Sequence, residues 1–195
     1  VYVDHETAAN LAVNHLLKMG HRNILLLNGP EHLPSSQHFL TGYRKSLEEK
    51  GVPFREHLVK HNYIGIGETC SQMERIINGQ DCVGPEDFTA IATLSDVIAI
   101  GIYEAALSLR FAIPETYSVV GYDNILATKY LNPPLTTINQ PKQQTGLYAA
   151  NILLDCIEQR ASEKVQIILN PELLVRSSVA RCTAEYDKSL STQSL

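Results

Sequence analysis

The chain has 195 residues, 44% of them hydrophobic, and its 16 Lys and Arg against 21 Asp and Glu give a formal net charge of −5. This length and apolar content predict a globular chain with a sizeable core, and no stretch reaches the roughly 20 apolar residues of a membrane span. The acidic balance, with no basic block, argues against a DNA-binding surface on these residues.

The first half of the chain alternates apolar runs with amphipathic stretches. Continuous apolar runs closed by turn residues are typical of buried strands, and apolar residues at helical spacing are typical of half-buried helices. The pattern predicts strands at 1–3, 23–28 and 59–64, and helices at 6–19, 36–50 and 68–77. The run at 1–3 has no starting turn before it, so we interpret it as the end of a strand that began upstream.

The centre of the chain, residues 88–141, contains two buried strands that each end in polar residues. The first, at 89–94, stops at Ser95-Asp96, and either residue is a good cap for the helix that follows. That helix places Ala99, Ile100, Tyr103, Ala106 and Leu107 on one stripe. The second strand, at 117–122, leads directly into Asp123. Ligands of open α/β sheets bind at the carboxyl ends of strands, so this edge is a candidate site.

The last third adds an extended proline-rich segment at 131–141, a helix at 145–159 and strands at 165–169 and 173–179. Within the helix, the apolar spacing predicts an inward face of Ala149, Ile152, Leu153, Cys156 and Ile157. Strands and helices alternate along the whole chain, and this order predicts an α/β fold with a parallel, doubly wound sheet.

Several short segments, in order, resemble the effector-binding core of lactose-repressor/galactose-repressor (LacI/GalR) transcription regulators. They are TAI (89–91), SD (95–96), AIG (99–101), IPE (113–115), SVVGYDN (118–124) and PPLTTINQP (133–141). Weaker matches continue at 3–4, 15–17, 20–22, 28–30, 42–43, 51–53 and 171–178. The resemblance implies a periplasmic-binding-protein-like fold of two doubly wound lobes.

The same resemblance divides the chain between those lobes. Residues 1–22 and 140–169 would form part of the N-terminal lobe, residues 23–139 and 170–184 the C-terminal lobe, and residues 185–195 a polar tail. Family members carry further N-lobe strands and a helix-turn-helix headpiece before this point. We therefore expect an incomplete N-terminal lobe with an exposed apolar patch, and a chain that is part of a longer protein.

Five residues are the candidate ligand contacts. Asp123 is the first candidate, since it can accept two sugar hydroxyls, and its alternative role is to cap the following turn. Gln140 can donate and accept at once, and Ser95 stands where the family usually has asparagine. Tyr63 matches a family aromatic that stacks on the ligand, and its alternative role is core packing. Phe39 replaces the family arginine three residues before the Gly-aromatic pair, a loss of roughly ten- to a hundredfold in affinity.

The sequence contains few residues arranged as a metal site, a nucleotide-binding loop or a catalytic motif. His57 and His61 on one strand would lie ~13 Å apart, too far to bind one metal ion. GIGETC (65–70) lacks the third glycine of a dinucleotide loop, and no catalytic motif is present, so we expect no metal, no cofactor and no enzyme activity. The four cysteines are scattered with no Cys-x-x-Cys pair, and we expect reduced thiols.

Together these observations predict the sensing part of a bacterial transcription regulator. Its partners would be a small effector, expected to be a sugar bound at roughly micromolar to millimolar affinity, a second copy bound through the C-terminal lobe, and DNA only through a missing headpiece. The expected location is the cytoplasm. The alternative is an extracytoplasmic sugar-binding protein of a transport system, which shares the fold. An enzyme that uses Asp96 and Asp123 as an acid/base pair is the third hypothesis.

Overall fold

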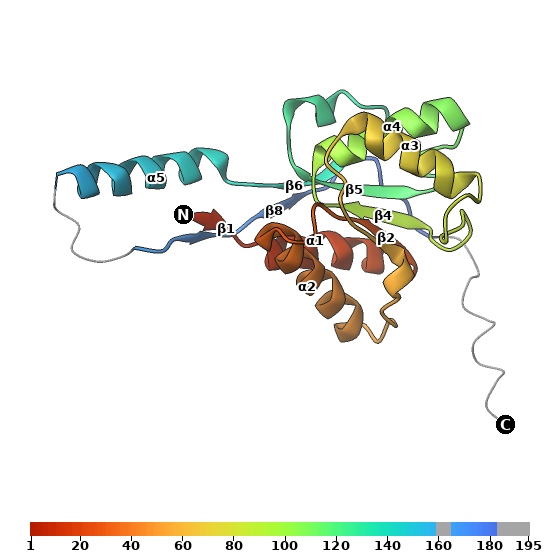
Figure 1. Ribbon diagram of the computed structural model, residues 1–195, viewed down its shortest axis with the longest axis horizontal. Coiled ribbons are helices and arrows are strands. Elements are labelled where there is room, and N and C mark those ends of the chain that lie inside the picture. The colour runs from red at the N-terminus through yellow and green to blue at the C-terminus, as the bar shows by residue number, and fades with distance from the viewer. Residues whose placement is uncertain (159–164, 183–195) are drawn as a thin grey trace.

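The computed structural model describes residues 1–158 and 165–182, and its largest element is a six-stranded sheet of order β3-β2-β4-β5-β6-β8 (Figure 1). All neighbours in this sheet are parallel except β6 and β8, which are antiparallel. The strands are β2 (Ile24–Leu27), β3 (Val59–Lys60), β4 (Ala90–Thr93), β5 (Ser118–Asp123), β6 (Thr136–Asn139) and β8 (Glu172–Leu174).

Helices cover both faces of the sheet, as in a doubly wound fold (Figure 1). The helices α1 (His5–Lys18) and α2 (Pro34–Glu49) pack on one face, and α3 (Ile66–Ile77) and α4 (Asp96–Leu109) pack on the other. Short 3-10 turns are η1 (Glu56–Leu58) and η2 (Leu126–Lys129). The strands β2 and β4 are buried along their whole length because both faces carry helices, which is why their sequences are continuous apolar runs. The predicted fold class is confirmed.

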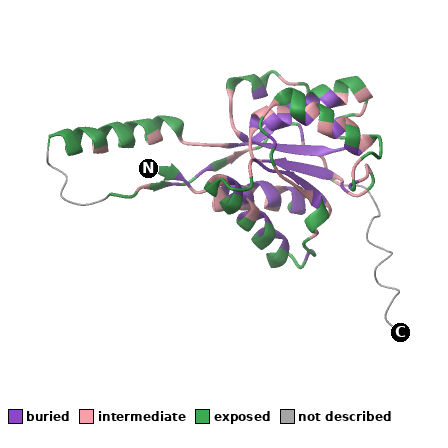
Figure 2. Ribbon diagram, viewed as in Figure 1, coloured by how far each residue is buried: buried purple, intermediate pink, exposed green. Residues whose placement is uncertain are grey.

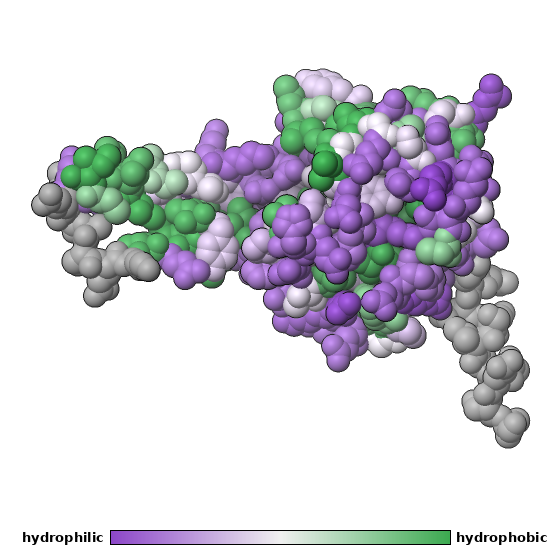
Figure 3. Space-filling model, in the orientation of Figure 1, coloured by the Kyte–Doolittle hydropathy of each residue, from purple (hydrophilic) through white to green (hydrophobic). Residues whose placement is uncertain are grey.

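A smaller body extends from one end of this sheet. It consists of the parallel pair β1 (Tyr2–Val3) and β7 (Ile168–Leu169) and of α5 (Lys142–Ile157), which projects away from the main body (Figure 1). No residue of α5 is buried, and Figure 2 shows the helix as almost entirely exposed. The face predicted to point inward is therefore open, with Leu153 and Ile157 61% and 67% exposed. The apolar surface of this body is visible in Figure 3.

The position of α1 corrects the expected division between lobes. The sequence assigned residues 6–19 to the N-terminal lobe, but α1 buries Ala8, Ala12 and Leu16 in the core that α2 and the large sheet share. Gly42 allows this close packing, since a Cβ at that position would lie under 3.0 Å from the Glu6 carbonyl oxygen. The smaller body thus contains β1, β7 and α5 without α1. The tail expected at 185–195 lies outside the described residues.

Two local expectations are also corrected. The strand expected at 59–64 forms only Val59–Lys60, because the chain leaves the sheet there and Asn62 adopts a positive φ of 70°. On α4, the buried face contains Ile98, Ala99 and Ile102, whereas Leu107 is 83% exposed. Within the described residues, none of the helices has the length and apolar character needed to cross a membrane.

Candidate functional site

A cavity of about 310 Å³ opens at the carboxyl ends of the parallel strands. Its walls come from the first turns of α1, α2 and α4, the loops after β2, β3 and β4, the end of β5 and the segment after β6. The lining residues are His5, Gly29, Pro30, Ser35, Tyr63, Ile64, Leu94, Ser95, Ile98, Tyr122, Asp123 and Gln140. Four of the five residues predicted from the sequence therefore lie around one cavity, and Phe39 does not.

Asp123 is the last residue of β5 and the only formally charged side chain among those that line the cavity. In the register of β5 and β6, Asp123 lies opposite Asn139, the last residue of β6. Gln140, the residue after Asn139, donates a hydrogen bond from Nε2 to Asp123 Oδ1. Burial, followed by the negative charge of Asp96, raises the pKa of Asp123 to about 6, against the lowering effects of Gln140 and Lys142. The carboxylate is thus an acceptor held in place by an amide.

Ser95 has two roles at the start of α4. It is the N-cap of the helix, and its Oγ accepts a hydrogen bond of 3.2 Å from Ile98 N. The hydroxyl hydrogen remains available to a ligand in the cavity, since a serine hydroxyl donates once and accepts twice. Asp96, the other residue considered as the cap, is instead the first residue of α4 and fully buried.

Tyr63 and Phe39 differ in their relation to the cavity. Tyr63 follows β3, lies in the cavity wall and is 6% exposed, and burial raises the pKa of its phenol to about 12. Phe39 is fully buried on α2 and contacts the ring of Tyr122 edge-on, with 5.9 Å between ring centroids. Phe39 therefore packs behind a cavity residue and does not line the cavity itself.

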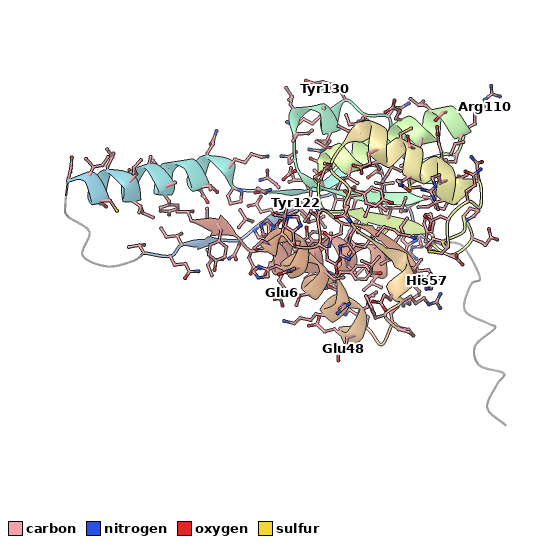
Figure 4. The ribbon with its side chains drawn as sticks, in the orientation of Figure 1. Glu6, Glu48, His57, Arg110, Tyr122 and Tyr130 are labelled. Carbon is pink, nitrogen blue, oxygen red and sulfur yellow. The ribbon has the colours of Figure 1, made fainter. Side chains whose placement is uncertain are left out.

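Sequence reasoning missed His5, Ser35 and Tyr122 as cavity residues. Tyr122 lies at the end of the sheet beside α1 (Figure 4), and its Oη is 2.9 Å from His5 Nδ1. Two signals could have identified the pair. Tyr122 directly precedes Asp123, and His5 directly precedes the helix expected at 6–19.

A second cavity, of about 410 Å³, borders the segments that cross between the two bodies. Gln140 lines both cavities. Two residues after Gln140 comes Lys142, whose Nζ donates to the backbone carbonyl oxygens of Asp123 and Asn124. Within residues 1–158 and 165–182, no group of three His, Cys, Asp or Glu side chains is placed to hold a metal ion.

Comparison with known proteins identifies the family. Residues 13–179 match the periplasmic binding protein-like domain. The HTH-type transcriptional repressor CytR of Escherichia coli (strain K12) is 34% identical over 178 residues, which cover 91% of this chain and 51% of that protein. The chain spans about half the length of the curated relatives it matches.

Solved structures give the same result. A LacI family transcriptional regulator from Enterococcus faecium with bound ribose is 28% identical, with a TM-score of 0.81, and the match covers 92% of this chain and 65% of that one. A second, from Enterococcus faecalis V583 and also with bound ribose, is 29% identical with a TM-score of 0.77, covering 92% and 62%. The chain therefore belongs to the periplasmic binding protein-like domain family and is similar, within it, to the effector-binding domains of LacI-family transcription regulators.

Proposed function

We propose that this chain is the effector-sensing domain of a LacI-type transcription regulator and that it binds a small, neutral sugar in the cavity at the end of β5. The observation that carries the proposal is the convergence of Asp123, Gln140 and Ser95, from three separate segments, on one cavity with the ring of Tyr63. The ribose bound to the two Enterococcus regulators supports the ligand class.

The lining chemistry suits a polyhydroxylated molecule. Ionised Asp123 accepts from two hydroxyls, at roughly 1.5 to 3 kcal/mol for each charge-assisted bond. Gln140 and Ser95 add groups that donate and accept, and the apolar face of a sugar ring packs on Tyr63. No Lys or Arg is among the residues that line the cavity, so a neutral sugar is favoured over a phosphorylated one.

The contact between Asp123 and Gln140 gives a route from ligand to conformation. Gln140 belongs to the segment that leads from β6 into α5. In this structure its amide donates a hydrogen bond to the Asp123 carboxylate oxygen that would accept a sugar hydroxyl. A ligand that replaces this amide changes how the crossing segment is held. Its different affinity for the two arrangements would then shift their populations.

Regulation further requires a second copy and a DNA-binding part. We propose a homodimer through the larger body, because Leu107, Leu126 and Tyr130 on its surface are 83%, 69% and 78% exposed. Figure 4 labels Tyr130 at the edge of this body. DNA would be contacted by a separate helix-turn-helix headpiece, in the cytoplasm. Sedimentation at rising concentration tests the dimer: a monomer throughout, unaffected by Leu107→Glu, would contradict it.

The alternative function is sugar capture for a transport system, which uses the same fold. The relatives named as transcriptional repressors favour the regulator. The reading frame upstream of Val1 decides between the two functions, since a helix-turn-helix supports the regulator and an export signal supports the transport protein.

A calorimetric titration tests the ligand site. The probes are D-ribose, D-glucose and adenosine, with ribose 5-phosphate as the charged control, and each is titrated into the parent and into Asp123→Ala. We expect at least one neutral probe to bind the parent and to lose about a hundredfold or more in affinity with the variant. If no neutral probe binds, or if the variant binds equally well, the proposed site is wrong.

A further inference from the structure

His5 and Tyr122 form a polar pair in the cavity wall that can donate a hydrogen bond, whereas ionised Asp123 can only accept one. His5 is the first residue of α1 and Tyr122 the penultimate residue of β5, and Tyr122 Oη lies 2.9 Å from His5 Nδ1. Their rings are tilted by 44° with centroids 5.7 Å apart. Both residues line the cavity, so the pair faces the same space as Asp123 and Gln140.

The protonation of the pair follows from its surroundings. Burial, followed by the positive charge of His38, lowers the pKa of His5, against the opposing effect of Asp4, and the imidazole is neutral at pH 7. Burial and two nearby carboxylates raise the pKa of Tyr122, which keeps its phenol protonated. The phenol therefore donates to Nδ1, and the imidazole carries its hydrogen on Nε2.

Neighbouring residues hold the ring of Tyr122 and the turn that carries His5. Phe39 contacts the Tyr122 ring edge-on. The turn that carries His5 is fixed by Asp4, whose Oδ1 accepts from Thr7 N at 2.9 Å and whose Oδ2 accepts from Thr7 Oγ1 at 2.7 Å. The pair is thus preorganised, and little rotamer entropy remains to be lost when a ligand binds.

We propose that the His5–Tyr122 pair is a second polar contact point for the sugar, with His5 Nε2–H donating to a ligand oxygen and the Tyr122 oxygen accepting from a ligand hydroxyl. This inference rests on the proposed function of the same cavity. Ionised Asp123 only accepts, so the pair supplies the donor that the carboxylate cannot. The Tyr122 oxygen lies at Nδ1 and the donor is Nε2–H, on the other side of the imidazole ring, so the two members would bind different oxygens of the same sugar.

The pair also connects the ligand to a second crossing segment. His5 directly follows Asp4, whose backbone N–H donates to Leu169 O of β7 at 3.1 Å. Gln140 lies on the crossing between β6 and α5. A sugar held by His5 and Asp123 together would therefore contact both crossing segments. His5, bonded to Tyr122, leads to the crossing at Asp4, and Gln140, bonded to Asp123, lies on the crossing between β6 and α5.

Two variants of the whole chain test the pair by calorimetry with D-ribose, D-glucose and adenosine. Tyr122→Phe removes only the hydroxyl and keeps the ring that Phe39 contacts, and His5→Asn keeps a short polar side chain. We expect each to weaken the best-bound probe about tenfold. The double variant should lose little more than either single variant, because the two residues act as a unit.

A spectroscopic measurement gives an independent readout. ¹⁵N NMR of the imidazole should show His5 as the Nε2–H tautomer at pH 7 in the parent, with a change in shift when the probe is added, and a mixture of tautomers in Tyr122→Phe. Unchanged affinity in both single variants, alongside lost affinity in Asp123→Ala, would overturn the inference and leave the proposed function intact. Failure of all three probes to bind the parent would overturn both.

Discussion

The buried carboxylate of Asp96 accepts a hydrogen bond of 2.6 Å from Thr137 Oγ1, and this bond joins the first turn of α4 to strand β6. Its second oxygen accepts from Ile125 N at 2.8 Å, just beyond the end of β5. Burial raises the pKa of Asp96 against the lowering effect of these two bonds. Strand β5 passes the Asp96 carboxylate at Gly121, and a Cβ at this glycine would lie under 3.0 Å from Asp96 Oδ1. Asp96 thus fixes the strand ends that present Asp123.

Gly121→Ala tests this close approach. The added methyl group would push against the Asp96 carboxylate and against Leu135, whose Cδ2 would also lie under 3.0 Å away. Neither neighbour has free space, because both are fully buried. We expect the free energy of unfolding, measured by urea titration, to fall by about 1 to 3 kcal/mol.

Gly146→Ala is the matched control. Gly146 lies within α5, and a Cβ there meets nothing within 4 Å. Alanine should leave stability unchanged or raise it by up to about 1 kcal/mol, through helix propensity alone. Equal losses in the two variants would contradict the role given to Gly121.

The sequence predicted the site better than it predicted the bodies around it. Strand β4 is a continuous apolar run that ends in polar residues, and parallel strands bring such ends to one edge, so the convergence of Ser95 and Asp123 followed from the pattern. Helix α1 shows the limit. Its apolar spacing gives the buried face but does not say which sheet covers that face, and the resemblance assigned it to the wrong lobe.

Phe39 shows a different limit. The resemblance to a family arginine position predicted a ligand contact at Phe39. A large apolar side chain, however, gains more free energy from burial in the core beneath α2 than from facing a polar cavity. No spacing in the sequence links His5 to Tyr122, because 117 positions separate them and only the fold brings the start of α1 to the end of β5.

Asp123→Asn should separate stability from binding. The pKa of Asp123 is raised from 3.8 to about 6, so the folded chain keeps a proton that the unfolded chain loses across this range. Stability contributed by the protonated form is present below about pH 4 and is lost as the pH rises to about 6. Asparagine has no charge to bury, so the variant should lack this downward slope and be more stable than the parent at pH 7.

The measurement is the free energy of unfolding from urea titrations at intervals between pH 4 and pH 7. Sugar binding, followed at pH 7, should be lost in the same variant because the amide accepts more weakly than a carboxylate. A parent whose stability is flat or rises across the window, with the variant parallel to it, would show that Asp123 is not buried as the structure has it.

Ser178→Ala tests how the segment after β8 is joined to β5 and β6. Ser178 Oγ accepts from Thr136 N at 2.8 Å and donates to Val119 O at 2.6 Å, and the serine is fully buried. Alanine would leave a buried N–H and a buried carbonyl without these partners, so we expect a loss of roughly 1 to 3 kcal/mol in unfolding free energy. The exposed neighbour provides the control, because Ser177→Ala should change stability by less than about 0.5 kcal/mol. Equal effects would place the cause outside these two hydrogen bonds.

The double variant Leu153→Gln, Ile157→Gln tests the open face of α5. These side chains lie four residues apart on one side of the helix and are 61% and 67% exposed. Figure 3 shows apolar surface on the smaller body to which the helix belongs. Exposed apolar surface binds the dye ANS, so we expect lower ANS fluorescence in the variant.

The main sheet should not be affected, because no residue of α5 is buried against it, and glutamine keeps a helix propensity close to that of leucine. We therefore expect the urea midpoint of the parent to be retained. Asp155→Gln, on an exposed polar position of the same helix, controls for the substitution itself and should leave ANS fluorescence unchanged. A lower urea midpoint in the double variant alone would show that α5 packs on the large sheet in solution, because only a buried face loses stability when its apolar side chains become polar.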